Sequence, residues 1–247
     1  MRPHDIAEVR HLPLFRDMLK VSFEQLVQGA YAQTFPAGME LIRQGDPADF
    51  LHVVLEGSVE LYANWENRLC TMAVVNPIGT FILAACIKDA PYLMSARTLE
   101  RSRLLLVPAS DLRAVFRRDP EFAVSTITEL AGCYRAVVRH AKCLKLRNSR
   151  ERIAAYLLKQ SRNLGGIARF TLSVEKRLIA SYLGMTPENL SRAIRTLDEV
   201  GVQVKGQQVT IIDMARLQAF VPPDPLIDGP DTGGATAGVS LPQGVAS

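Results

Sequence analysis

Residues 174–200 read VEKRLIASYLGMTPENLSRAIRTLDEV, and this stretch decides how the chain is interpreted. Two short helices are predicted on either side of Gly184, because glycine tolerates the backbone conformation that a tight turn needs. Thr186 offers a hydroxyl to cap the second helix, and Pro187 suits its first position. Leu190 begins an apolar stripe on that helix. The pattern therefore predicts a helix-turn-helix.

The second of these helices presents Glu188, Ser191 and Arg192 on one face, since residues three and four apart align on a helix. In a major groove an arginine can bond guanine twice, and a glutamate can accept from the paired cytosine. The alternative is a surface ion pair between Glu188 and Arg192, worth a few tenths of a kcal/mol. Polar residues expected to contact the DNA backbone or support the reading helix are Thr186, Asn189, Arg195, Lys176, Arg177 and Lys205.

The charge of this segment and a predicted hairpin after it both favour nucleic acid as its partner. Residues 147–221 carry a net charge of +6, whereas residues 1–107 carry −2. A positive excess concentrated on a small module is typical of phosphate binding. Residues 202–204 and 209–212 flank a turn that includes Lys205, which predicts a hairpin wing. The module is thus expected to be a winged helix-turn-helix that binds double-stranded DNA.

The N-terminal half has another periodicity. Helical spacing occupies residues 4–28, and short apolar stretches between turn residues follow up to Val107. Evenly spaced short strands indicate an antiparallel roll or sandwich, and no βαβ rhythm of a dinucleotide-binding enzyme occurs. The chain is therefore expected to be an α+β protein. The predicted strands are 39–42, 50–55, 59–63, 70–75, 81–87, 92–96 and 104–107.

A long helix is predicted from Asp119-Pro120 to about Leu146, and its apolar residues alternate at spacings of three and four. This alternation favours a dimer seam between two parallel copies, although packing against the chain's own β-domain would also explain an apolar stripe. The seam residues are Ile127, Leu130, Tyr134, Val137, Ala141 and Leu144. A break at 147–149 predicts a hinge, with Ser149 capping the next helix.

The domain boundaries follow from these changes in pattern. We expect a sensor β-roll with flanking helices over 1–118, a dimerisation helix over 119–147, a winged helix-turn-helix over 148–221 and a disordered tail over 222–247. The tail is rich in proline and glycine and lacks aromatic residues. No apolar run is long enough for a membrane span, and no secretory signal precedes the first helix, so a cytoplasmic location is expected.

This order of elements resembles the CRP/FNR superfamily of bacterial transcription regulators over about residues 8–220. Residues 188–192, Glu-Asn-Leu-Ser-Arg, fit the E-x-x-S-R recognition helix of the FNR branch, and Gly45, Gly57 and Gly79 fall where the family has turn glycines. The resemblance implies a homodimer that binds a TTGAT palindrome through Glu188, Ser191 and Arg192. It also implies RNA polymerase as a partner and genes of low-oxygen or nitrogen-oxide metabolism as targets.

The chain departs from the family at its effector site. Leu83 replaces the turn glycine of the cyclic-nucleotide cassette, Ala84 the ribose-binding glutamate and Met94 the phosphate-binding arginine. Without that cation a buried phosphate is costly, so cyclic AMP is not expected as the effector. The clustered N-terminal cysteines of an iron–sulfur cluster are also missing, since the first cysteine is Cys70. An apolar effector pocket is expected from Ile82, Leu83, Ala84, Ala85, Cys86, Met94 and Ser95.

Haem is one effector that such a pocket would accept, and a regulator without an effector is the alternative. The available axial ligands are His4, His11, His52, Cys86 and Met94, none of which lies in a haem motif. Cys133 and Cys143 on the long helix could form a redox switch, but inert buried thiols are favoured.

Two other classes of function are considered. An enzyme is not expected, because the sequence has no nucleophile elbow, metal-ligand spacing or paired carboxylates. A cyclic-nucleotide-responsive module, or a small-molecule-binding protein without a DNA target, is the remaining alternative.

Overall fold

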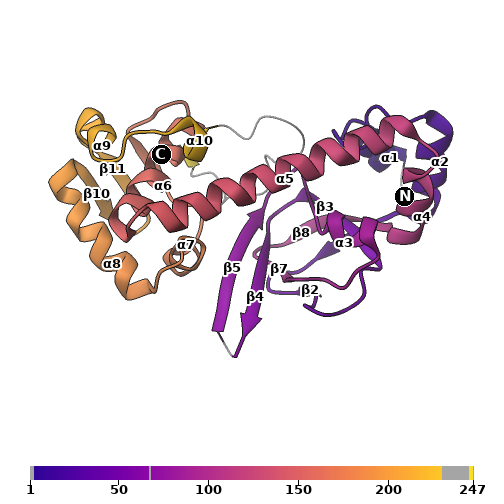
Figure 1. Cartoon of the computed structure of the whole chain (residues 1–247), viewed down its shortest axis with the longest axis horizontal. Helices are drawn as coiled ribbons and strands as arrows, with labels where there is room; N and C mark the ends of the chain where they lie inside the picture. The colour runs from indigo at the N-terminus through magenta and orange to yellow at the C-terminus, as the bar shows by residue number, and fades with distance from the viewer. Residues whose placement is uncertain (1–2, 67, 230–244, 247) are drawn as a thin grey trace. The chain divides into compact units, whose positions relative to one another are not determined.

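The computed structural model describes residues 3–66, 68–229 and 245–246, and it divides into two compact units. The first unit ends at Ala136 and the second begins at Val137, so the boundary lies within the long helix α5, Pro120–Leu146 (Figure 1). Each unit has its own strands and helices.

The first unit is built on two four-stranded antiparallel sheets. One has the order β1-β8-β3-β6 and the other β2-β7-β4-β5. Both sheets combine strands from distant parts of the sequence, as a roll requires. The strands are β1 Tyr31–Phe35, β2 Glu40–Ile42, β3 Phe50–Glu56, β4 Val59–Trp65, β5 Arg68–Val75, β6 Gly79–Phe81, β7 Ser95–Thr98 and β8 Ser102–Pro108.

The expected antiparallel roll is thus confirmed, with three local corrections. The strand expected at 92–96 is β7, Ser95–Thr98, because residues 91–94 lie in a loop. Residues 81–87 were expected to form a strand, but β6 ends at Phe81 and helix α3, Leu83–Lys88, follows. Ile82 begins this helix from a left-handed backbone conformation with φ of 67°, and Leu83 and Cys86 face the core. An apolar run of this length does not distinguish a buried strand from a buried helical turn. Strand β1 was missed altogether, since most of its side chains are exposed or half-buried.

Helices flank the two sheets of the first unit. They are α1 Pro3–Arg10, α2 Lys20–Gly29 and α4 Ala109–Phe116, followed by the N-terminal part of α5. The core includes fully buried Phe15 and Phe122, whose rings stack with centroids 6.2 Å apart. Asp119 starts α5, because its carboxylate accepts from the backbone N–H of Phe122 at 3.0 Å and of Leu19 at 2.8 Å. The predicted start and end of the long helix are confirmed.

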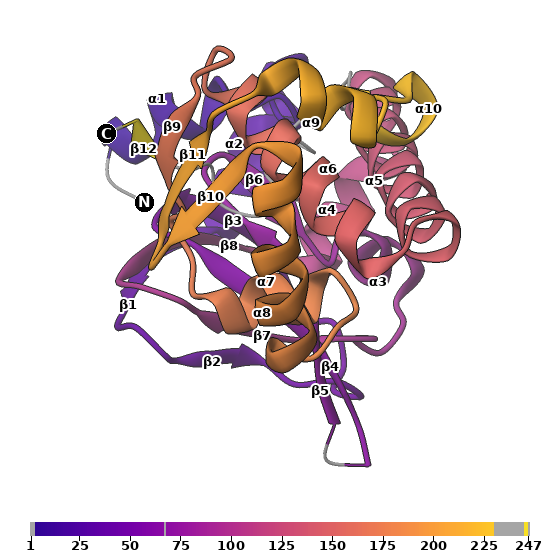
Figure 2. The same ribbon diagram turned by 90° about the vertical axis from the view of Figure 1, so that its left-hand side faces the viewer.

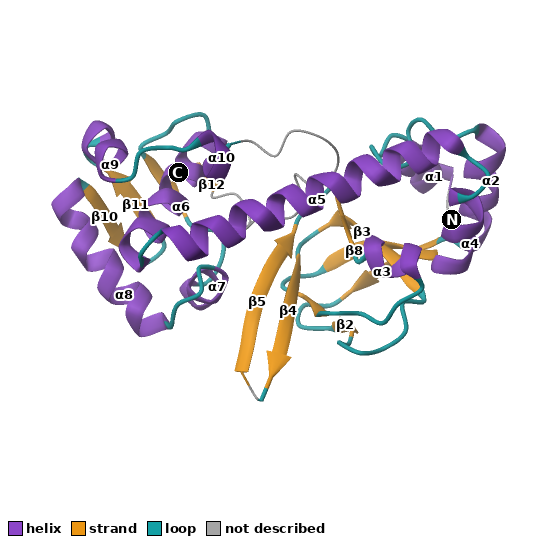
Figure 3. Cartoon of the chain, viewed as in Figure 1, coloured by secondary structure: helices purple, strands orange, loops and turns teal. Residues whose placement is uncertain are grey.

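The second unit contains the C-terminal part of α5, helix α6 Ser149–Asn163 and the predicted winged helix-turn-helix (Figures 2 and 3). Asn148, not Ser149 as expected, caps α6. Its side chain accepts from the N–H groups of Arg150 and Glu151, while Glu151 accepts from the N–H of Asn148. This reciprocal arrangement is a capping box. The remaining elements are β9 Arg169–Thr171, α7 Lys176–Tyr182, α8 Pro187–Thr196, a 3-10 helix Leu197–Val200, β10 Val202–Lys205, β11 Gln208–Ile211 and α9 Met214–Phe220.

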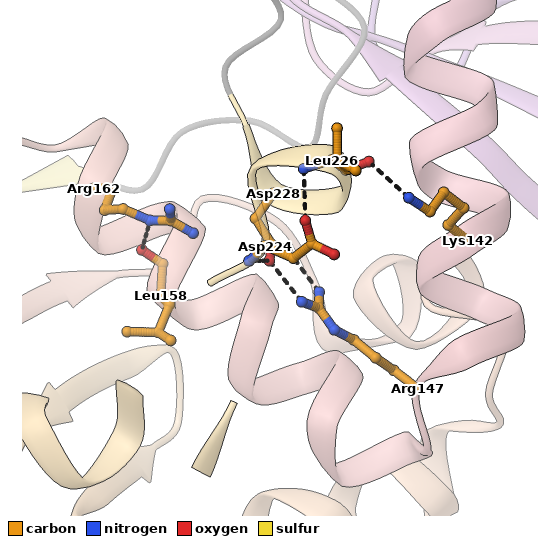
Figure 4. A network of polar contacts seen from close by, with 7 residues as sticks. All are labelled: Lys142, Arg147, Leu158, Arg162, Asp224, Leu226 and Asp228. Carbon is orange, nitrogen blue, oxygen red and sulfur yellow. Dashed lines mark hydrogen bonds and ion pairs between the residues drawn. The ribbon is translucent and has the colours of Figure 1, made fainter. Parts of the chain in front are cut away.

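The segment after α9 is ordered where the sequence predicted a disordered tail from residue 222. Residues Pro225–Asp228 form a short helix, α10, capped by Asp224. Asp228 accepts two hydrogen bonds, of 2.7 and 2.6 Å, from Arg147 directly after α5, and Lys142 donates to the carbonyl of Leu226 (Figure 4). We refer to residues 221–229 as the C-terminal strap. Most of the tail, residues 230–244 and 247, lies outside the described residues, and Val245–Ala246 pair with β9 as β12.

Candidate DNA interface and sensor cavity

Helix α8 is held in place by one buried face, which leaves the other face free for a ligand. Leu190 and Leu197 are 1% and 0% exposed, and Ala193 and Ile194 are buried between them. The Thr186 hydroxyl accepts from the N–H of Asn189 at 3.2 Å and caps the helix, as the sequence predicted. Pro187 occupies the first turn. These local signals fix where the helix begins.

The three predicted base-contacting residues share the exposed face of α8. Glu188, Ser191 and Arg192 are all exposed, within the first turns of the helix. Arg192 donates to the side-chain oxygen of Asn189 at 2.5 Å, and the Ser191 hydroxyl donates to the carbonyl of Pro187 at 2.9 Å. The sequence also allowed a surface ion pair between Glu188 and Arg192. That pair is not among the ion pairs of the described residues. Because these side chains are held only by exposed hydrogen bonds to neighbouring residues, they can replace those bonds with hydrogen bonds to base edges.

The pKa of Glu188 is lowered, so its carboxylate is negative at neutral pH. The main causes are a hydrogen bond from its own backbone N–H and one from the Thr186 hydroxyl, and the positive charge of Arg192 adds to them. An ionised glutamate can only accept hydrogen bonds. The Glu188 carboxylate can therefore pair with the amine of cytosine, which donates in the major groove, and cannot pair with a base atom that accepts.

The helix-turn-helix accepts hydrogen bonds from two arginines on α6. The sequence did not predict this role for them. Arg152 donates to the carbonyl of Leu183 at 2.5 Å, where the turn before α8 begins. Arg150 donates to the carbonyl of Thr196 at 2.7 Å and to the carboxylate of Glu199 at 2.8 Å, at the other end of α8. Together they satisfy carbonyls at the C-terminal ends of α7 and α8. The local sequence pattern does not indicate these contacts, because both arginines are more than 30 residues away in the chain from the carbonyls that they bond.

The residues predicted to contact DNA phosphates occupy the two elements that border α8. Arg177 is exposed and Lys176 half-buried at the start of α7, and Arg195 is exposed at the end of α8. Lys205 is exposed at the tip of the hairpin formed by β10 and β11, the predicted wing. Exposed cations next to a helix that can enter a groove suit backbone contacts.

Helix α5 carries an exposed apolar stripe that differs in phase from the predicted dimer seam. Ile127, Tyr134 and Val137 are 58%, 71% and 66% exposed, as a seam without its partner should be. Leu130 instead packs against the core of the first unit, and Ala141 and Leu144 are half-buried in the second unit. We define the exposed stripe as the apolar residues from Val124 onward that follow one another at alternating spacings of three and four and are open to solvent. They are Val124, Ile127, Ala131, Tyr134 and Val138. Val137 is exposed beside this stripe.

The residues predicted to line an effector pocket belong mostly to the core of the first unit. Leu83, Cys86 and Ser95 are buried, Ile82, Ala85 and Met94 are half-buried, and Ala84 is exposed. Burial raises the pKa of the Cys86 thiol to about 12, so it stays protonated. No carboxylate stands at Ala84 for a ribose and no cation at Met94 for a phosphate. These residues therefore do not fit a cyclic nucleotide bound in the family's manner.

A cleft of about 480 Å³ in the first unit lies elsewhere, and none of those seven residues lines it. His52 is the only one of the haem-ligand residues named above that lines this cleft, and haem stays a prediction. The lining residues are Tyr31, Gln33, Phe35, Met39, Glu40, Leu41, Ile42, Asp46, Pro47, Asp49, Phe50, His52, Tyr92 and Leu106.

The cysteines and acidic residues give no sign of redox or metal chemistry in the described part of the chain. Burial raises the pKa of Cys133 to about 11 and also raises that of Cys143, which disfavours reactive thiolates. Within residues 3–66, 68–229 and 245–246, no three His, Cys, Asp or Glu side chains are grouped to hold a metal ion. In the same ranges no helix has the length and apolar character to cross a membrane.

Comparison with known proteins identifies both units. A family model described as the cyclic nucleotide-binding domain matches residues 32–119, and one described as the Crp-like helix-turn-helix domain matches residues 151–220. The chain is 26% identical over 182 residues to the Anaerobic regulatory protein of Pasteurella multocida, covering 72% of this chain and 67% of the relative. It is 24% identical over 189 residues to the CRP-like cAMP-activated global transcriptional regulator of Mycobacterium tuberculosis, covering 74% and 84%.

Solved structures have the same fold. FixK2 from Bradyrhizobium japonicum superposes with a TM-score of 0.67 at 24% identity, covering 79% of this chain and 98% of that protein. Apart from Tyr31, the strands of the first unit lie within the first matched domain and the helix-turn-helix lies within the second, with the long helix α5 between the two matches. The chain therefore belongs to the CRP/FNR family of transcription regulators, whose helix-turn-helix domain binds DNA.

Proposed function

We propose that this regulator binds, as a homodimer in the cytoplasm, a palindrome of FNR-like TTGAT half-sites. Arg192 bonds the guanine of each half-site, Glu188 accepts from the paired cytosine, and Ser191 contacts a neighbouring base or phosphate. The observation that carries the proposal is the exposed trio on the first turns of α8, opposite a fully buried face. In helix-turn-helix proteins this end of the recognition helix enters the major groove.

The proposed targets are genes of low-oxygen or nitrogen-oxide metabolism, with RNA polymerase as the partner at the promoter. Support comes from relatives whose names state such roles, the Anaerobic regulatory protein and the Fumarate and nitrate reduction regulatory protein of Salmonella typhi, 24% identical over 188 residues. Another relative is named as cAMP-activated. The residues at Leu83, Ala84 and Met94 argue against that effector here.

The base contacts can be tested with Arg192→Ala in the full-length protein. Binding to a TTGAT palindrome should weaken by about 1–3 kcal/mol per half-site, and the preference for guanine at that position should relax. Lys205→Ala is the matched control, because loss of a phosphate contact should weaken all sequences alike and reduce the salt slope by about one. Fluorescence anisotropy at several salt concentrations measures both. Unchanged affinity and sequence preference of Arg192→Ala would refute the assignment.

Dimerisation is proposed to use the exposed stripe of α5 rather than the full seam predicted from the sequence. Two copies of the stripe side by side would bury five apolar residues per chain, which include Ile127 and Tyr134. Spacings of three and four keep such a stripe on one side of a helix pair. Leu130 and Leu144 are left out, because contacts within their own units already occupy them.

Analytical ultracentrifugation tests this interface. Ile127→Asp together with Tyr134→Asp places charges in the stripe and should give monomers, since an unpaired buried carboxylate costs several kcal/mol. Thr128→Asp is the control, because Thr128 is exposed on α5 outside the stripe. It should remain dimeric. A dimer in both variants would mean that another surface joins the two copies.

A further inference from the structure

The cleft in the first unit has an acidic rim. Glu40, Asp46 and Asp49 contribute carboxylates, and no lysine or arginine is among the residues that line it. Glu40 is already bonded to Arg43 at 2.8 Å and accepts from the Tyr62 hydroxyl at 3.0 Å. Asp46 and Asp49 line the cleft and are both exposed, and the charge of Arg43 acts on Asp46 as well as on Glu40. The negative potential at the mouth is therefore carried mainly by these two aspartates.

A buried histidine with one unpaired ring nitrogen is among the residues that line the cleft. His52 is 3% exposed, and its ring stacks on Phe81 with centroids 5.0 Å apart. Its Nδ1 has no hydrogen-bond partner within the described part of the chain. Burial lowers the pKa of His52 to about 4, against a smaller opposite effect of a hydrogen bond between the ring and the Phe50 backbone, so the ring is neutral. Buried polar atoms are almost always bonded, and an unpaired one in a cavity wall points to a bonding occupant.

The walls of the cleft are aromatic. Tyr31 and Phe50 meet edge to face with centroids 6.0 Å apart, and Phe35 and Tyr92 also line the space. Aromatic faces attract organic cations through the ring quadrupole, the more so when the cation loses water. Aromatic walls with carboxylates at the rim are thus chemically suited to a positively charged ligand with an apolar body.

Other classes of occupant fit less well. A metal ion would need several close ligands, and the described residues contain no such group of three. Haem carries two propionates, which the carboxylates of Asp46 and Asp49 would repel. A volume of about 480 Å³ is within the usual range of small-molecule sites.

We propose that this cleft binds a small organic cation, an amine with an aromatic or apolar body. Asp46 and Asp49 attract the ammonium group, Tyr31, Phe50 and the neighbouring rings enclose the body, and His52 Nδ1 bonds a polar group of the ligand. The site is distinct from the seven residues 82–86, 94 and 95 predicted as the effector pocket. Any control of DNA binding by the ligand rests on the proposed function, whereas binding itself does not.

Isothermal titration calorimetry of the full-length protein with three probes of similar shape tests the charge requirement. Phenethylamine should bind, 2-phenylethanol should bind about tenfold more weakly, and 3-phenylpropionate should give no heat up to about 10 mM. Equal binding of the alcohol and the amine, or no heat with the amine, would overturn the proposal.

Variants test the location. Asp46→Asn with Asp49→Asn should weaken phenethylamine binding about tenfold, since the rim loses both charges. Asp17→Asn, an exposed acidic position in the same unit that is not in the cleft, should bind like the unmodified protein. Circular dichroism verifies that both variants are folded. Unchanged binding in the double variant would place the amine elsewhere.

Two further results separate this inference from its rivals. A Soret band in the purified protein that disappears in His52→Phe would assign the cleft to haem and overturn the cation proposal. Binding of phenethylamine by a protein that ignores the TTGAT palindrome would refute the proposed function and leave the cleft assignment standing. The reverse outcome would refute the cleft assignment alone.

Discussion

Removal of the Asp228 carboxylate should release the C-terminal strap from Arg147, which directly follows α5. Arg147 and Asp228 share two hydrogen bonds of 2.7 and 2.6 Å, and their side chains are only 9% and 8% exposed. In Asp228→Ala, Arg147 keeps its charge in a place shielded from water. The strap must then detach so that the guanidinium can be hydrated, or the charge must remain unpaired.

The size of the effect follows from this burial. A hydrogen bond to a charged group contributes about 1.5–3 kcal/mol, and breaking a buried pair by removing one partner costs about 3–5 kcal/mol. Detachment of the short strap limits the loss, because it gives Arg147 access to water. We therefore expect a coupling energy of about 1.5–3 kcal/mol in a double-mutant cycle of Arg147→Ala and Asp228→Ala.

Urea unfolding of the four proteins at pH 7 measures this energy, and hydrogen exchange of residues 221–229 reports detachment. The pair Arg150–Glu199 is the matched control, since its side chains are 31% and 70% exposed. Such a pair should couple by less than about 1 kcal/mol in its own cycle of alanine variants. A coupling energy as small for Arg147–Asp228, with unchanged exchange in the strap, would refute the reasoning.

The dependence on pH provides an independent check. Burial pushes the pKa of Asp228 upward, but the hydrogen bonds from Arg147 and the Asp224 N–H and the charge of Arg147 outweigh it, so the pKa is lowered. Because the pKa of Asp228 is lower in the folded state than in the unfolded state, the carboxylate stabilises the fold at pH values above the unfolded-state pKa of about 3.9. The coupling should therefore be complete at neutral pH and disappear as the pH falls below about 4. Coupling that grows on acidification would contradict this sign.

Three other changes probe separate parts of the fold. Asp119→Ala removes the acceptor for the N–H groups of Leu19 and Phe122 and should lower the free energy of unfolding by about 2–3 kcal/mol in urea titrations. Gly184→Ala should cost about 1–2 kcal/mol more than Gly206→Ala in thermal unfolding, since both have positive φ but a Cβ at 184 would lie 3.2 Å from Leu144 and Arg152. In the unmodified protein the free energy of unfolding should fall by about 3 kcal/mol between pH about 6.5 and 4, because the unfolded state binds a proton at His52 that the buried neutral ring does not. His52→Phe should remove this dependence on pH. An unfolding free energy of the unmodified protein that stays constant over this range would contradict the last prediction.

The local patterns in the sequence predicted the winged helix correctly because each signal acts within a few residues. Thr186 caps α8 and Pro187 lies in its first turn, as expected, and the hairpin around Lys205 forms between residues that are neighbours in the chain. The same locality explains the error at 81–87. There a short apolar run fits either a strand or a helical turn, and burial of Leu83 and Cys86 against the core selected the helix α3.

The exposed stripe of α5 was only half predicted, because spacing alone does not distinguish contacts within the chain from contacts with a second copy. Ile127 and Tyr134 are exposed as expected, whereas Leu130 packs against the core of the first unit. Ala131 is exposed next to Leu130, and Val137 and Val138 are both exposed. Which apolar residues stay free depends on what the folded units cover.

The sequence by itself determined the class of each unit, the start and end of the long helix and the exposed trio on α8, since capping, turn and periodicity signals are local. Only the tertiary structure decided the aromatic cleft that His52 lines, the arginines of α6 that bond the C-terminal ends of α7 and α8, and the strap on Arg147. Each of these joins residues far apart in the chain. Such contacts depend on how buried surfaces and charges are satisfied in three dimensions, which leaves no periodic trace along the sequence.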